Sequence, residues 1–126
     1  MKIIVDTSVF IDFSRSRKGD YSKLVEGSAI GRYELVVPTI VIAEFYAGES
    51  MNVRSKIIQA GRLFLNISRV DLNENIAKLT GELIRKGLIY GFDAIVAATA
   101  LTLGAELATG NKKHFAKVKG LRFFVG

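Results

Sequence analysis

The chain has 126 residues, 49% of them hydrophobic, with no cysteine and a net charge of +6. These figures predict one globular domain, residues 1–126, and exclude a disulfide framework, thiolate chemistry and a disordered chain. No apolar run approaches the roughly 20 residues of a membrane span, and the start of the chain lacks a signal-peptide pattern. We therefore expect a cytoplasmic protein that does not engage a membrane.

The N-terminal half alternates apolar runs with helical periodicity. Ile3–Val5 is an unbroken β-branched run, which predicts a buried strand, and Asp6 follows it where a helical pattern begins. A basic loop, a helix capped by Asp20, a second strand and two further helices should follow. Their expected ranges are 14–19, Asp20 to about Gly31, Glu34–Val37, Thr39 to about Gly48, and about Asn52 to Leu65.

The C-terminal half continues this alternation. Ala94–Leu103 has no polar face, so we expect this helix, which Asp93 starts, to be buried against the sheet. The other expected elements are a strand centred on Ile67–Val70, a helix of about Asn73 to Gly87, a strand at Glu106–Thr109, a turn or short helix at Asn111–Phe115, and a strand at Leu121–Val125. Strands alternating with helices predict an α/β fold whose five-stranded, mainly parallel sheet is sandwiched by helices.

Three carboxylates stand where the local sequence explains them poorly. Asp6 follows the first strand, Glu44 lies in an otherwise apolar helix after the second, and Asp93 begins the helix before the fourth. Asp6 and Asp93 have a simpler alternative role as helix N-caps. Glu44 falls on a face that we expect to point toward the core, where its alternative partner is a buried lysine or arginine.

These three positions share one edge of a parallel sheet, because the helices start beyond the carboxyl ends of the strands. Crowded carboxylates repel one another unless a hard cation holds them, which indicates Mg²⁺, with Mn²⁺ as a substitute. Zn²⁺ is disfavoured because the chain has no cysteine and one histidine. An acidic pocket on a basic protein is typical of a metal-dependent nuclease, in which the ion activates a water for attack on a phosphodiester.

Positive charge gathers in two stretches of the sequence. After Glu106 the chain has no further acid but several cations, and a second basic group follows the first helical pattern. The two groups are Lys112, Lys113, Lys117, Lys119 and Arg122, and Arg15, Arg17 and Lys18. Such clusters favour a polyanionic partner, typically nucleic acid, and a general solubility charge is the alternative.

Four segments carry most of these features, in the order IIVDTSVFIDF, ELVVPTIVIAEFYAG, FDAIVAATAL and LATGNKKHF. In this order and spacing they resemble the PIN-domain ribonucleases, and among them the VapC toxins of VapBC toxin–antitoxin operons. The resemblance covers essentially the whole chain. It implies a PIN-like fold and a Mg²⁺- or Mn²⁺-dependent endoribonuclease that cleaves RNA.

The resemblance also assigns roles to particular residues. Asp6 and Asp93 would be direct metal ligands, and Glu44 would bind the metal directly or through a water. Ser8 would support the site by hydrogen bonding, and Thr109 occupies the family's threonine or serine position after the fourth strand.

Where many members of that family carry a fourth acid, this chain has Asn111, a fourth candidate metal ligand that can offer an amide oxygen to a metal or its waters but brings no charge. The number of metal ions, one or two, therefore stays open. His114 is a candidate substrate contact or proton donor, and an exposed histidine without a role is the alternative. The residues expected to contact RNA are Arg15, Arg17, Lys18, Lys112 and Lys113.

The family further implies a homodimer and a small VapB-like antitoxin whose C-terminal segment covers the acidic pocket, often with an arginine or lysine. The apolar content of the first helix and of Phe45–Tyr46 suits such a groove, and a plain core role is the alternative. Two other functions remain open: a PIN-like nuclease in RNA processing outside a toxin operon, and a non-catalytic RNA-binding domain. The sequence does not encode the RNA target.

Overall fold

The computed structural model describes residues 1–16 and 20–125. Its strands are β1 (Lys2–Val5), β2 (Glu34–Pro38), β3 (Ser68–Val70), β4 (Glu106–Ala108) and β5 (Arg122–Phe123). They form one sheet in the order β3–β2–β1–β4–β5, and every neighbouring pair is parallel. The predicted five-stranded α/β architecture is therefore confirmed.

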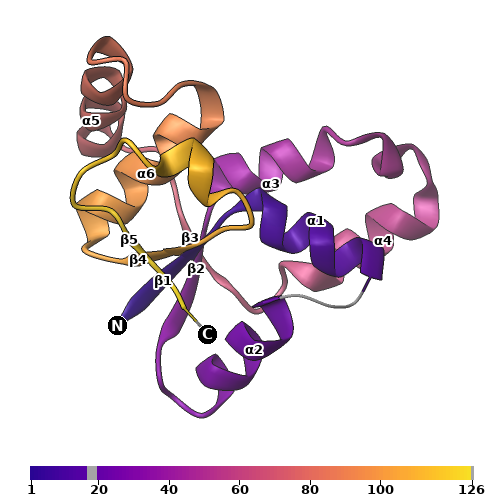
Figure 1. Ribbon diagram of the computed structural model, residues 1–126. Helices are drawn as coiled ribbons and strands as arrows, with labels where there is room; N and C mark the ends of the chain where they lie inside the picture. The colour runs from indigo at the N-terminus through magenta and orange to yellow at the C-terminus, as the bar shows by residue number, and fades with distance from the viewer. Residues whose placement is uncertain (17–19, 126) are drawn as a thin grey trace.

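Helices cover this sheet. They are α1 (Thr7–Ser16), α2 (Asp20–Ala29), α3 (Thr39–Tyr46), α4 (Arg54–Leu63), α5 (Glu74–Arg85) and α6 (Gly91–Leu103), with short 3-10 helices η1 (Glu49–Asn52) and η2 (Lys112–Phe115). In Figure 1, α6 and α5 lie on one side of the view, and η1 and α4 reach out on the other side near α1. None of the helices described is both long and apolar enough to span a lipid bilayer.

The core forms on both faces of β1. Its residues Ile3, Ile4 and Val5 are all completely buried, although their side chains alternate between the two faces of the sheet. Helix α6 contributes a nearly continuous buried run from Ala94 to Ala100, as expected from its lack of a polar face. This burial holds the central strand rigidly in place, which fixes the position of the residue that follows it.

A cluster of aromatic rings joins α1, α3 and α4. The ring of Phe64, at the end of α4, lies 4.8 Å from the ring of Phe10 and 5.4 Å from that of Phe45, measured between centroids. Tyr21 of α2 extends the cluster, 5.2 Å from Phe10. Tilted and edge-on rings at these separations pack favourably. The cluster therefore ties together the helices that flank the carboxyl end of β1.

The register of the strands aligns their carboxyl ends. Ile4 of β1 is paired with Val36 of β2 on one side and with Leu107 of β4 on the other. Asp6, just beyond β1, and Thr109, just beyond β4, consequently meet at the same edge of the sheet. In open parallel sheets this edge is where ligands bind.

Helix α1 extends further than the sequence pattern predicted. It continues to Ser16, so Arg15 lies in its last turn and not in a basic loop. The hydroxyl of Ser14 donates to the carbonyl of Ile11 at 3.0 Å, and the hydroxyl of Ser16 donates to a carbonyl one turn earlier at the same distance. These side-chain bonds supplement the helical bonds of a polar segment that resembles a loop in sequence.

Helix α6 begins earlier than predicted, at Gly91, and its N-cap is Tyr90. Asp93 therefore lies inside the first turn, and the alternative of Asp93 as an N-cap is wrong. Two other differences have simple causes. The 3-10 helix η1 has no periodic signal in its four residues, and β5 is short because its only partner, β4, has three residues.

Candidate metal centre

A hollow of about 290 Å³ opens at the carboxyl edge of the sheet. Its lining includes all three carboxylates that the sequence singled out: Asp6 from the end of β1, Glu44 from α3 and Asp93 from α6. Arg15 and Asn111 also line it. We call it the acidic hollow. Segments that are far apart in the sequence thus contribute acids to one small space.

Asp6 is 3% exposed and accepts two hydrogen bonds on a single carboxylate oxygen. The Ser8 hydroxyl donates to Asp6 Oδ2 at 2.9 Å, and the Thr109 hydroxyl donates to the same atom at 2.8 Å. These are the two residues expected to support the site. Because both bonds end on Oδ2, neither of these two hydroxyls occupies the other oxygen, Oδ1.

The loop after β4 is fastened directly to this pair of hydroxyls. The Gly110 amide donates to Ser8 Oγ at 2.9 Å, and the Asn111 amide donates to Thr109 Oγ1 at 3.0 Å. A Cβ atom on Gly110 would lie 3.3 Å from Asp12 Oδ2 and 3.5 Å from Ser8 Oγ. Glycine therefore lets the loop pass close over α1, which keeps Thr109 within reach of Asp6.

Glu44 lies on the wall of the hollow and is neither fully buried nor fully exposed. The alternative in which Glu44 pairs with a buried lysine or arginine is therefore wrong, whereas a hydrogen-bond donor in a cleft is what the fold supplies. Its partner is Thr7, whose hydroxyl donates to Glu44 Oε1. Sequence reasoning missed Thr7, although a polar residue beside Asp6 at the start of a buried helix was a usable signal.

Asp93 is 29% exposed in its side chain and faces His114, whose Nδ1 lies 3.3 Å from Asp93 Oδ2. Burial raises the pKa of the Asp93 carboxyl, and the negative charge of Asp6 raises it further. His114 acts in the opposite direction and lowers that pKa, through its charge and its hydrogen bond. Asp6 is therefore close enough for its negative charge to oppose the ionisation of Asp93.

Within residues 1–16 and 20–125, no three acidic, histidine or cysteine side chains lie close enough to hold a metal ion by themselves. The donor set still suits Mg²⁺ or Mn²⁺, because Mg²⁺ keeps several waters and takes only one or two carboxylates from a protein. Asp6 and Asp93 form such a pair, and a cation bound by both would relieve their repulsion.

The remaining predicted residues fall into two groups. Arg15 and Asn111 line the acidic hollow, whereas Lys112 and Lys113 lie on η2 at the surface. The Lys112 ammonium lies 5.9 Å from the centre of the Phe123 ring, so it also makes a cation–π contact with β5. Two residues expected to contact RNA, Arg17 and Lys18, lie outside the described residues.

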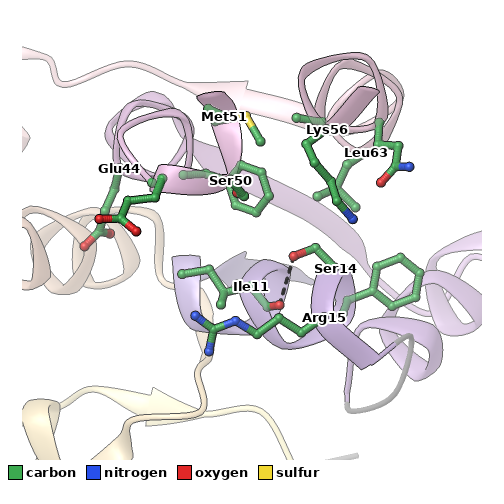
Figure 2. A pocket seen from close by; sticks show the side chains of 14 residues that line it. Ile11, Ser14, Arg15, Glu44, Ser50, Met51, Lys56 and Leu63 are labelled. Carbon is green, nitrogen blue, oxygen red and sulfur yellow. Dashed lines mark hydrogen bonds between the residues drawn. The ribbon is translucent and has the colours of Figure 1, made fainter. Parts of the chain in front are cut away.

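A larger hollow of about 510 Å³ adjoins the acidic hollow and runs between α1 and the α3–η1–α4 segment (Figure 2). The two hollows share Ile11, Arg15 and Glu44. In Figure 2, Glu44 marks one end of the larger hollow and Lys56 lies toward the other. The apolar residues that line it are Ile11, Phe13, Phe45, Met51, Ala60 and Leu63. We call it the α1–α4 groove.

Comparison with known proteins agrees with the fold described above. A family model described as the PIN domain matches residues 3–121. The chain is 31% identical over 128 residues to Ribonuclease VapC1 of Methanocaldococcus jannaschii, covering 98% of this chain and 87% of that protein. It is also similar in structure to a chain of the DNA-bound VapBC of Salmonella typhimurium, with a TM-score of 0.81, 20% identity and coverage of 98% and 97%.

A second solved structure, VapBC2 of Rickettsia felis bound to a DNA fragment from its promoter, gives a TM-score of 0.80 with 23% identity. The match covers 98% of each chain. At these identities, the two structural likenesses establish the fold and nothing finer. The family match and the identity to the archaeal relative are independent of them, and both extend over nearly the whole chain.

Proposed function

The chain belongs to the PIN-domain family, and from that premise we propose that it is a metal-dependent endoribonuclease, the toxin of a VapC-type toxin–antitoxin pair. The observation that carries the proposal is the acidic hollow, in which Asp6, Glu44 and Asp93 come together at the carboxyl edge of the sheet. The relative named Ribonuclease VapC1 supports the activity, because it is 31% identical along almost the entire chain.

Mg²⁺, or Mn²⁺ in its place, would supply charge neutralisation and an activated water to the phosphodiester. Asp6 and Asp93 would hold the ion directly, and Glu44 would hold it through a water. Ser8 and Thr109 keep Asp6 Oδ2 occupied and so orient its other oxygen toward the hollow. Asn111 borders the hollow and offers a neutral amide oxygen, so we propose that any second ion binds only when RNA adds phosphate oxygens.

RNA would approach over the cations that surround the hollow. Arg15 lies at the junction of the acidic hollow with the α1–α4 groove. Lys112 and Lys113 lie on η2, the turn that also carries His114 to Asp93. Cations on both sides of an acidic centre would hold the phosphates that flank the cleaved bond while the centre itself stays negative.

The test is cleavage of total RNA with Mg²⁺, by wild type and by variants that remove one metal ligand each. We expect Asp6→Asn and Asp93→Asn to abolish cleavage while the thermal melting of the protein persists. Asp71→Asn, which changes an exposed acid outside the hollow, should cleave like wild type. Undiminished cleavage by a clean Asp93→Asn preparation would overturn the proposal, and RNA binding without cleavage by wild type would favour the non-catalytic alternative.

The α1–α4 groove would receive the partner protein. We propose that an apolar segment of a small VapB-like antitoxin packs along it and extends a basic side chain toward Glu44, at the end where the groove meets the acidic hollow. The similar structures from Salmonella typhimurium and Rickettsia felis are of VapBC complexes, which supports this kind of partner. We further propose a cytoplasmic homodimer. A small reading frame adjacent to the gene would separate the toxin from a PIN-like nuclease of RNA processing.

A further inference from the structure

Asp6, Glu44 and Asp93, three of the acids that line the hollow, share one arrangement: a side-chain donor lies against one carboxylate oxygen and leaves the second open. Ser8 and Thr109 both donate to Oδ2 of Asp6, and neither of these bonds reaches Oδ1. Thr7 donates to Oε1 of Glu44, and this bond likewise does not reach the second oxygen, Oε2. A donor on one carboxylate oxygen restricts the rotation of the group and so favours one direction for the free oxygen.

Asp93 completes the arrangement, because His114 Nδ1 faces its Oδ2 at 3.3 Å and its Oδ1 is open among the described residues. We propose that His114 is a positioning residue, which orients the Asp93 carboxylate for metal binding. This inference rests on the proposed metal-dependent function. It gives His114 neither contact with the substrate nor a part in proton transfer. It also makes His114, and not Asn111, the residue of the loop after β4 that supports the metal ligands.

The turn that carries His114 is anchored independently of the imidazole. Phe115, the next residue, is completely buried. The His114 amide donates to the carbonyl of Asn111 at 2.9 Å, and the Val118 amide donates to that of Phe115 at 3.1 Å. The backbone therefore presents the imidazole from a fixed place, while the side chain itself is 61% exposed. Changing this side chain leaves the core of the protein untouched.

Asp93 needs such a donor more than an ordinary surface acid does. An aspartate carboxyl rotates readily about its terminal bond, and the charge of Asp6 opposes that of Asp93. Without a donor on Oδ2, the Asp93 carboxylate would turn away from Asp6 and toward water, which would separate the two proposed ligands. Asn111 does not replace His114, because it contacts the site through its backbone amide, which donates to Thr109.

The experiment measures Mn²⁺ binding in the absence of RNA, by the electron paramagnetic resonance signal of free Mn²⁺. His114→Leu removes the donor but keeps a side chain of similar bulk, and His114→Asn places an amide nitrogen where Nδ1 was. We expect His114→Leu to weaken Mn²⁺ binding by about 10-fold, in the usual range for such partners, and His114→Asn to restore most of the affinity. Lys117→Leu, at an exposed position after the same turn, should bind Mn²⁺ like wild type.

The outcomes separate this inference from the function on which it rests. Wild-type affinity in His114→Leu, or equal weakening in His114→Asn and His114→Leu, would overturn the positioning role. Absence of Mn²⁺ binding by wild type, or wild-type binding by Asp93→Asn, would instead overturn the proposed metal centre. Thermal melting without metal should be the same in all of these variants, so that a loss of binding is not a loss of fold.

Discussion

Thr7 and Ser8 stand side by side at the start of α1 and donate to different carboxylates. Ser8 donates to Asp6, and Thr7 donates to Glu44, which lies on another helix. Thr7 is 4% exposed, so its hydroxyl has no access to bulk water as an alternative partner. Two adjacent hydroxyls therefore connect two of the three acids to one short segment of backbone, and that segment follows directly from the central strand.

Removing only the Thr7 hydroxyl tests this connection. Thr7→Val keeps the shape of the side chain, and we expect RNA cleavage to fall by about 10- to 100-fold, as is typical when a group that orients a metal ligand is lost. Thr7→Ser, which keeps a hydroxyl, should retain most of the activity. Initial rates on one RNA substrate at saturating Mg²⁺ give the comparison.

A matched control for Thr7→Val is Thr80→Val. Thr80 is also buried, but its hydroxyl donates to the carbonyl of Ile76 within its own helix at 2.7 Å. This variant loses a buried threonine hydroxyl without touching the acidic hollow, so its cleavage rate should equal that of wild type. Equal rates for Thr7→Val and Thr80→Val would contradict the role of Thr7.

Sequence reasoning reached the acids but not all of their partners. Asp6, Glu44 and Asp93 stood out because each is a charge in an apolar setting, and Ser8 and Thr109 came from the family resemblance. Thr7 and His114 did not stand out as partners, because their contacts join segments that no periodic pattern relates. Such pairs depend on which strands and helices become neighbours, and this is settled only when the chain folds.

At the scale of elements, the packing of the helices around the α1–α4 groove centres on one aromatic ring, that of Phe64. Phe64 is 2% exposed and packs against Phe10 of α1 and against Phe45 and Tyr46 of α3. It lies just beyond α4, a helix whose only buried residue is Ala60. The packing of α4 onto the body of the protein therefore depends strongly on Phe64.

Phe64→Ala should destabilise the protein by about 3–5 kcal/mol, the usual range for deleting a buried aromatic ring. Its neighbour Leu65 is 66% exposed, and Leu65→Ala should change the free energy of unfolding by no more than about 0.5 kcal/mol. Urea denaturation followed by circular dichroism measures both. Similar midpoints for the two variants would show that α4 is held by contacts other than this ring.

The elements themselves were predicted well where their pattern was long. Helix α6 followed from its apolar run, and α5 lies within its predicted range, with Asn73 as an N-cap that accepts from the Ile76 amide at 2.9 Å. We predicted that Asp93 starts α6 because aspartate favours the cap position. That prediction was wrong, since the helix begins at Gly91. The sequence did not predict the shape of the α1–α4 groove, because η1 and the break after α3 leave no periodic signal in the sequence.

At the scale of the whole molecule, positive charge surrounds an acidic centre. The net charge of +6 attracts a polyanion, while the hollow concentrates the acids at one edge of the sheet. The alternation of strands and helices predicted a parallel sheet, but it did not specify the strand order. That order, with β1 between β2 and β4, is what places Asp6 at the middle of the edge.

RNA binding should weaken as salt rises, because each contacted phosphate releases counterions on binding. The affinity of Asp6→Asn, which binds without cutting, should fall with a log–log slope of about 0.7 per contacted phosphate. Arg15→Gln should make the slope shallower by about one contact. Lys78→Gln, which removes a cation already paired with Glu74 at 3.1 Å, should leave it unchanged. An affinity that does not depend on salt would exclude the basic surface as the path of RNA.

The central strand comes first in the chain, and its partner β4 comes near the end. Thr109 is 103 residues away from the Asp6 carboxylate to which it donates. During synthesis, Asp6 therefore has neither that hydroxyl nor its second neighbouring strand until β4 and Thr109 have been made. A chain interrupted before β4 would carry all three acids without the pairing that brings them together. A chain with this topology can complete its acidic hollow only after β4 has been synthesised.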